Sequence, residues 1–257
     1  MGIVRDIKKI VFKSIDRVCN TTFYPDLMIK SSRSISFMRS DYKISKDNLY
    51  IYIHVPKTAG TTFHYIAQKI NMVKKEKIYL SSHNPLSIYH SPEDTNYVTT
   101  IRDPVERAYS YYNMNYYHKK ALYHYLAKKS LEHFMKYCPE TQNIFCKFYS
   151  GYINENVNDN IYQIASKNSK KFMRIFNFDN IEKELNNFCN QIDFPIDKIP
   201  QINAYNKLFN VDNKKINRIN REVIEFYNYY DLKLYSDLNK ILNKVNSKNI
   251  NPFTNIN

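Results

Sequence analysis

Strand and helix signals alternate along this chain, and that alternation constrains its fold more than any other feature. The apolar run 50–55 (YIYIHV) ends at a proline, and apolar positions then recur with helical spacing up to residue 70. The runs 95–101 (TNYVTTI) and 172–176 (FMRIF) are likewise followed by helical patterns. Because strands that alternate with helices form parallel sheets, we expect an α/β fold with helices on both faces of the sheet.

Capping residues locate the start of the helix after the second strand. Asp103 can cap this helix, Pro104 suits its first position, and Glu106 stands where a capping box carries its carboxylate. Farther along, 130–150 is predicted to be helical with its apolar side chains on one face, and the chain is predicted to be helical again from about residue 213.

The length of 257 residues and the hydrophobic fraction of 43% suit a globular chain that buries its own core. No apolar run approaches the roughly 18 residues of a membrane span, and the opening residues lack the apolar core of a secretory signal. We expect residues 1–48 to form a basic helix, near 3–18, with a polar connector, and residues 49–257 to form one domain with a helical C-terminal part. A cytoplasmic location is expected; a Golgi luminal domain whose anchor was removed is the alternative.

The charge of the chain limits its partners. Lysine and arginine number 38 against 24 aspartate and glutamate, which gives a formal net charge of +14. Such an excess favours phosphates, nucleic acid, acidic glycans or anionic lipid, although a gene rich in A and T would produce it without any function. No nucleic-acid-binding module is recognisable, so nucleic acid is not expected. The N-terminal basic helix is a candidate for peripheral membrane contact, and the oligomeric state stays open.

The four cysteines are widely spaced and include no CxxC pair. Because metal sites usually bring ligands in close pairs, we expect no metal. The thiols are predicted to be reduced and partly buried, and a Cys138–Cys146 disulfide is left open for a secreted protein.

The turn after the first strand carries the residues of an anion site. In a parallel α/β unit this turn presents ligands to the positive N-terminal end of the next helix. Lys57 supplies a mobile positive charge, and Gly60 lets backbone amides approach an oxyanion. The side chains of Thr58, Thr61 and Thr62 add three hydroxyl donors. A Walker A loop differs, because its lysine follows the last glycine. The pattern predicts a phosphate cradle; an ordinary turn with a solvated lysine is the alternative.

A second cationic position follows the second strand. Arg102 stands at the carboxyl end of that strand, where parallel sheets bind ligands, and Ser110 lies about two turns into the next helix. The planar arginine fork suits a phosphate, and the serine adds a hydroxyl donor. Two phosphate sites on neighbouring strand ends predict a nucleotide with phosphates at both ends. A simple pairing of Arg102 with Asp103 is the alternative.

The stretches VPKTAGTTF (55–63) and YVTTIRDPVERAYSYY (97–112) together resemble the sulfotransferases that use 3′-phosphoadenosine 5′-phosphosulfate (PAPS). The likeness is greatest to the polysaccharide branch, which includes the uronosyl 2-O-sulfotransferases of heparan and dermatan sulfate. It implies a P-loop-like three-layer sandwich with a central parallel sheet flanked by helices, and PAPS as donor without a metal. It also implies that Arg102 and Ser110 hold the 3′-phosphate. The 5′ side would be cradled by Lys57, Thr58, Ala59, Gly60, Thr61 and Thr62.

Weaker likenesses extend the match to roughly residues 50–240. The segment 138–151 resembles the part of the family that lines the acceptor cleft, 174–185 resembles a family strand and helix, and 226–238 resembles its C-terminal helix. Residues 1–48 match nothing in the family.

Sulfuryl transfer to an alcohol calls for a cation at the leaving oxygen and for a base. We assign the cation to Lys57. Histidine suits the base near neutral pH, and His83 lies in the loop where the polysaccharide branch carries its histidine; it is the predicted base, with His90 in reserve. His54 is expected to pack in the core within its strand, and His64 to lie at the surface.

A basic chain rich in tyrosine predicts a carbohydrate acceptor and would suit an anionic one, through charge and ring stacking. Asn143 and Asn203 are candidates for the acceptor cleft. Four basic residues are candidates for its wall, each with a solvated surface position as the alternative: Arg107, Lys119, Lys120 and Lys147. The alternative functions are a sulfotransferase for a small-molecule or lipid alcohol, a phosphotransferase related to nucleotide kinases, and a non-catalytic protein that binds nucleotide or glycan.

Overall fold

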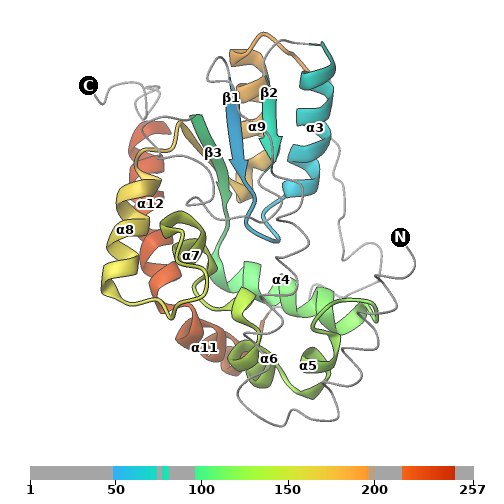
Figure 1. Cartoon of the computed structure of the whole chain (residues 1–257), viewed down its shortest axis with the longest axis vertical. Helices are drawn as coiled ribbons and strands as arrows, with labels where there is room; N and C mark the ends of the chain where they lie inside the picture. The colour runs from blue at the N-terminus through green and yellow to red at the C-terminus, as the bar shows by residue number, and fades with distance from the viewer. Residues whose placement is uncertain (1–48, 74–76, 81–95, 197–198, 200–215, 247–257) are drawn as a thin grey trace. The chain divides into compact units, whose positions relative to one another are not determined.

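A computed structural model describes residues 49–73, 77–80, 96–196, 199 and 216–246 (Figure 1). The predicted N-terminal helix and connector, the predicted base His83, its reserve His90, and Asn203 all lie outside the described residues.

The described strands form one parallel sheet, as predicted. Its order is β2-β1-β3-β4, and each neighbouring pair runs parallel. The strands are β1 (Leu49–Ile53), β2 (Lys77–Leu80), β3 (Asn96–Ile101) and β4 (Arg174–Asn177). Strand β4 begins two residues later than the predicted run, and the short β2 was not predicted from the sequence.

Helices fill most of the rest of the described chain. They are α3 (Gly60–Val73), α4 (Pro104–Tyr117), α5 (His124–Lys129), α6 (Leu131–Tyr137), α7 (Ile144–Ser150), α8 (Asp159–Ser169), α9 (Ile181–Gln191), α11 (Arg218–Tyr227) and α12 (Tyr229–Asn246), with short 3-10 turns η2 (Pro139–Thr141) and η3 (Phe178–Asn180). The region 130–150 is mostly helical, as predicted, but it is divided into α6, η2 and α7. The chain breaks at Pro139, which lacks a backbone N–H, and at Asn143, whose φ of 47° is left-handed.

The sheet is buried on both faces. Alternate residues of a strand point to opposite sides, so Ile51 and Ile53 enter one hydrophobic cluster and Tyr52 enters the other. The first cluster contains side chains from α7, α8 and α12, and the second contains side chains from α3 and α9. Figure 1 shows these two groups of helices on either side of the strands. The arrangement is an α/β fold compatible with a three-layer sandwich.

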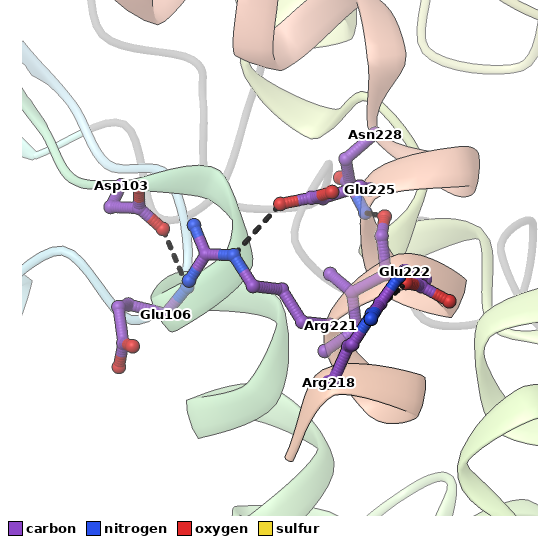
Figure 2. Close-up of polar contacts among 8 residues, drawn as sticks. Asp103, Glu106, Arg218, Arg221, Glu222, Glu225 and Asn228 are labelled. Carbon is purple, nitrogen blue, oxygen red and sulfur yellow. Dashed lines mark hydrogen bonds and ion pairs between the residues drawn. The ribbon is translucent and has the colours of Figure 1, made fainter. Parts of the chain in front are cut away.

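The start of α4 has the predicted cap. The Asp103 carboxylate accepts a hydrogen bond of 2.9 Å from the backbone N–H of Glu106, and Pro104 occupies the first helical turn. Helix α11 packs against α4, and Figure 2 shows the capping bond beside the ion pair between Arg221 and Glu225 of α11. The cap therefore fixes where α4 leaves the end of β3.

The strand order defines one switch point in the described sheet. From β1 the chain passes to β2 on one side, and it then returns to β3 on the other side of β1. In open parallel sheets ligands bind outside the carboxyl ends of the strands at such a point. The loops after β1 and β3 carry the two predicted phosphate motifs, which therefore lie at this switch point. None of the described helices combines the length and the apolar character that a bilayer span requires.

Candidate functional site

The loop after β1 is held in an unusual conformation. Lys57 and Ala59 have φ angles of 70° and 61°, in the left-handed region that costs a residue with a side chain about 1–2 kcal/mol. The Thr58 hydroxyl donates to the Val55 carbonyl at 2.7 Å, and the Tyr52 hydroxyl donates to the Thr58 carbonyl at 3.2 Å. Alternating left-handed residues are typical of loops whose backbone N–H groups gather into an anion-binding concavity. The Thr58 side chain, which is fully buried, supports the loop from inside.

Gly60 is required at the first position of α3 by a close neighbour. A Cβ built on Gly60 would lie 1.8 Å from His54 Nε2 and 2.2 Å from both Cδ2 and Cε1 of the same ring. Strand β1 ends at Ile53, so His54 belongs to the loop, and it is half-buried. The expectation that His54 packs in the core within its strand is therefore wrong. The imidazole covers the start of α3, and this contact supplies a steric reason for the glycine.

Lys57 stands in a strongly positive and partly buried place. Burial lowers the pKa of its ammonium to about 8, and the positive charges of Arg102 and Arg107 add to that shift. Of the two threonines that follow, Thr61 is exposed and Thr62 is buried. Negative charge brought to this position would relieve the repulsion between the cations, so the loop is suited to bind an anion.

Arg102 joins the second predicted site to the first. Its Nη1 donates to the Lys57 carbonyl at 3.2 Å, and its guanidinium lies 4.2 Å above the centre of the Phe178 ring. Burial lowers the pKa of Arg102, while the carboxylates of Glu106, Asp179 and Asp103 oppose that shift. Arg102 forms no ion pair with Asp103, because the Asp103 carboxylate caps α4 instead. Ser110 lies half-buried on α4. The structure thus brings Arg102 and the Lys57 loop together.

Two basic residues that were expected at the surface are buried. Arg107 is fully enclosed and Lys147 is only 4% exposed, so neither a solvated position nor a groove wall describes them. Arg107 Nη1 donates to the Glu140 carbonyl at 3.0 Å, and Lys147 Nζ donates to the Pro139 carbonyl at 3.4 Å. Arg107 follows Pro104 by three residues on the buried side of α4, so helical spacing was the sequence signal for its position. Lys119 and Lys120 are exposed.

Asn143 ties α7 to α12. Its side-chain oxygen accepts from the backbone N–H of Asp231 at 3.0 Å, and its own N–H donates to the Asn228 side chain at 3.2 Å. The Asp231 carboxylate accepts from Phe145 N and Cys146 N at 2.9 and 2.8 Å. Burial raises the pKa of Asp231, and these two hydrogen bonds oppose the shift. The side-chain oxygen of Asn143 thus serves this junction.

The remaining candidates occupy ordinary positions. His64 is exposed on α3 and contacts the Gln68 side chain at 2.7 Å, as expected of a surface histidine. The thiols of Cys138, Cys146 and Cys189 are free and buried, so the open question of a Cys138–Cys146 disulfide is answered in the negative. On α4, Tyr112 and Tyr116 pack ring to ring at 5.7 Å, and Lys128 lies 3.5 Å above the Tyr116 ring. These tyrosines pack α4 against its neighbours.

No protein-family model matches the chain, and no curated protein matches it. The function is therefore inferred from the residues and from their geometry.

Proposed function

We propose that this protein is a PAPS-dependent sulfotransferase that moves a sulfuryl group to a hydroxyl of a carbohydrate acceptor. One observation carries the proposal: Arg102 Nη1 donates to the carbonyl of Lys57, at the switch point of a parallel sheet. The guanidinium at one strand end thus contacts the loop that carries the lysine at the neighbouring strand end, and a cation at each of the two ends suits a ligand with a phosphate at each end. The left-handed backbone at Lys57 and Ala59 supports the same conclusion, because such loops bind oxyanions.

Each residue of the site has a role in the proposed reaction that follows from its chemistry. When bound, PAPS would supply the sulfuryl group and leave as adenosine 3′,5′-bisphosphate. Lys57 would stabilise the negative charge that grows on the leaving oxygen, with Thr58, Ala59, Gly60, Thr61 and Thr62 around the 5′ side. Arg102 and Ser110 would hold the 3′-phosphate. The base, His83 by its position in the sequence, would take the proton of the acceptor hydroxyl as the new oxygen–sulfur bond forms.

The fit of an anionic donor follows from the cations themselves. Lys57, Arg102 and Arg107 all have a lowered pKa because burial disfavours their charged forms. A multiply charged anion would reverse that penalty at every one of them. A P-loop-like fold is part of this proposal, and so is a carbohydrate acceptor. A small-molecule or lipid alcohol as acceptor is the alternative within the same chemistry.

Calorimetry with adenosine 3′,5′-bisphosphate tests the nucleotide. The wild type should bind it, Lys57→Ala and Arg102→Ala should bind it at least about tenfold more weakly, and Arg218→Ala should bind normally, since Arg218 is 91% exposed on α11. Transfer of labelled sulfate from PAPS to a panel of glycans, lipids and small alcohols then identifies the acceptor. A wild-type protein that never retains the bisphosphate would refute the proposal, and magnesium-dependent turnover of ATP would favour a phosphotransferase.

A further inference from the structure

Arg107 is a buried charge whose hydrogen-bonding capacity is mostly unused. It is 0% exposed, and only its Nη1 has a hydrogen-bond acceptor, the Glu140 carbonyl at 3.0 Å. Its Nε and Nη2 have no hydrogen-bond partner, and the guanidinium makes no ion pair with any residue that the structure describes. Buried polar groups are nearly always paired, so two unpaired donors on one buried cation call for a physical explanation.

The two unpaired groups form one edge of the guanidinium. In a planar guanidinium, Nε–H and the neighbouring Nη2–H point the same way and are spaced to meet two oxygens of one carboxylate, phosphate or sulfonate. The bond from Nη1 to Glu140 holds the opposite side of the group. Arg107 therefore presents an oriented fork with two parallel donors.

The acidic residues near Arg107 are engaged elsewhere. The Glu140 carboxylate accepts from the hydroxyl of Tyr111, and both oxygens of Asp231 accept from backbone N–H groups at the start of α7. A second buried cation, Lys147, contacts the carbonyl next to the one that Arg107 contacts. The negative charges of Asp231 and Glu140 still act on Arg107 and oppose the effect of burial on its pKa, but neither carboxylate accepts a hydrogen bond from the fork.

Arg107 also interacts electrostatically with the site at the switch point. Its positive charge is one of the causes that lower the pKa of Lys57, together with burial and Arg102. An anion bound at the Lys57 loop therefore acts on Arg107 as well. Since Arg107 is closed to solvent, an oxygen that reaches its fork meets little competition from water, and hydrogen bonds from a charged donor are strong in such a place.

We propose that the Nε–H and Nη2–H edge of Arg107 is an oxyanion-binding fork, which receives a phosphate or sulfonate group of the ligand held by Lys57 and Arg102. The identity of that ligand rests on the proposed function, whereas the fork itself rests on the geometry of Arg107. Occupation requires the segments around the side chain to open locally, because the guanidinium is closed in the structure.

Arg107→Lys tests the fork because it keeps the charge and removes the two parallel donors. Arg174→Lys is the matched control, since Arg174 donates to Glu184 and Gln191 of α9 and the same chemical change is made there, away from the fork. Calorimetry on the full chain uses three probes: adenosine 3′,5′-bisphosphate, inorganic phosphate and inorganic sulfate. We expect Arg107→Lys to weaken binding of the bisphosphate by about tenfold or more, and Arg174→Lys to leave it unchanged.

The probes separate the fork from the proposed function. Weaker binding of phosphate or sulfate by Arg107→Lys, in a protein that never binds the bisphosphate, would support the fork and refute the nucleotide. Equal affinity of Arg107→Lys and wild type for all three probes would overturn the fork and make Arg107 an enclosed core residue only. If Arg107→Lys does not fold, the proposal is tested by following the NMR resonance of Arg107 Nε–H in the wild type. This resonance should shift when the probe that binds is added, and an unchanged resonance would overturn the proposal.

Discussion

Gly60→Ala probes the contact between the cationic loop and His54. The added Cβ would lie 1.8 Å from His54 Nε2 and 2.2 Å from two ring carbons, whereas ordinary contacts begin at 3.4 Å. The three atoms belong to the outer end of the His54 ring, so either the imidazole must rotate away or the first turn of α3 must move. Overpacking of this kind costs about 1–3 kcal/mol. Alanine regains up to about 1 kcal/mol of helix propensity, so a net loss of about 0–2 kcal/mol is expected.

His54→Ala supplies the control for this prediction. Without the imidazole, Gly60→Ala should cost nothing or add stability, and the double-mutant cycle should give a coupling energy of about 1–3 kcal/mol, equal to the cost of the clash. Urea unfolding followed by circular dichroism measures all four proteins on one scale. An equal cost of Gly60→Ala with and without His54, or a stabilising effect of Gly60→Ala in the wild type, would refute the steric requirement for glycine at this position.

Four further outcomes are expected. Lys57→Ala should lower the rate of sulfuryl transfer by about two orders of magnitude or more, as measured with labelled PAPS, because its contact is strongest in the transition state. Because the pKa of Lys57 is lowered to about 8, binding of an anion that restores its charge should be coupled to the uptake of about half a proton per site at pH 8, nearly one near pH 9 and almost none near pH 6.5. Calorimetry in buffers of different ionisation enthalpy measures this uptake, and Lys57→Met should abolish it. His83→Ala should abolish turnover and leave the affinity for the bisphosphate nearly unchanged, and wild-type rates would assign the base elsewhere. Asp231→Ala should destabilise the fold to urea by about 2–4 kcal/mol, because two backbone N–H groups lose their acceptor, and a loss below about 1 kcal/mol would contradict that account.

Local signals were sufficient for the elements that carry the two motifs. The runs at β1 and β3, the apolar spacing of α3 and the cap at Asp103 depend on residues within a few positions of one another, and all of them are confirmed. The position of the motifs at a switch point follows from strand order, which depends on pairings between distant segments. A sequence pattern indicated that the sheet is parallel, but it did not contain the order.

Contacts between distant parts of the chain explain what the sequence did not indicate. The left-handed turn at Asn143 separates two helices in the region predicted to be helical. It is held by Asn228, at the junction of α11 and α12, and by Asp231 of α12. Arg107 presents a similar case. A charged residue is usually solvated, and only the packing of α4 against the rest of the domain encloses this one. Both results depend on tertiary structure, which local propensity does not encode.

The two cationic sites behave as one structural unit, because β3 holds the loop that follows β1. The Tyr52 hydroxyl reaches Thr100 Oγ1 at 2.9 Å as well as the Thr58 carbonyl, and Arg102 donates to the carbonyl of Lys57. These bonds fix the carbonyls of Lys57 and Thr58, so the end of β3 stabilises a loop conformation that is unfavourable by itself. Removal of Arg102 therefore takes away a cation and also a support of the loop. Arg102→Lys separates the two effects because it keeps the charge. If its affinity for the bisphosphate falls as far as that of Arg102→Ala, the loss comes from the missing support and the missing fork. If its affinity stays near the wild-type value, the charge of Arg102 is what matters for binding.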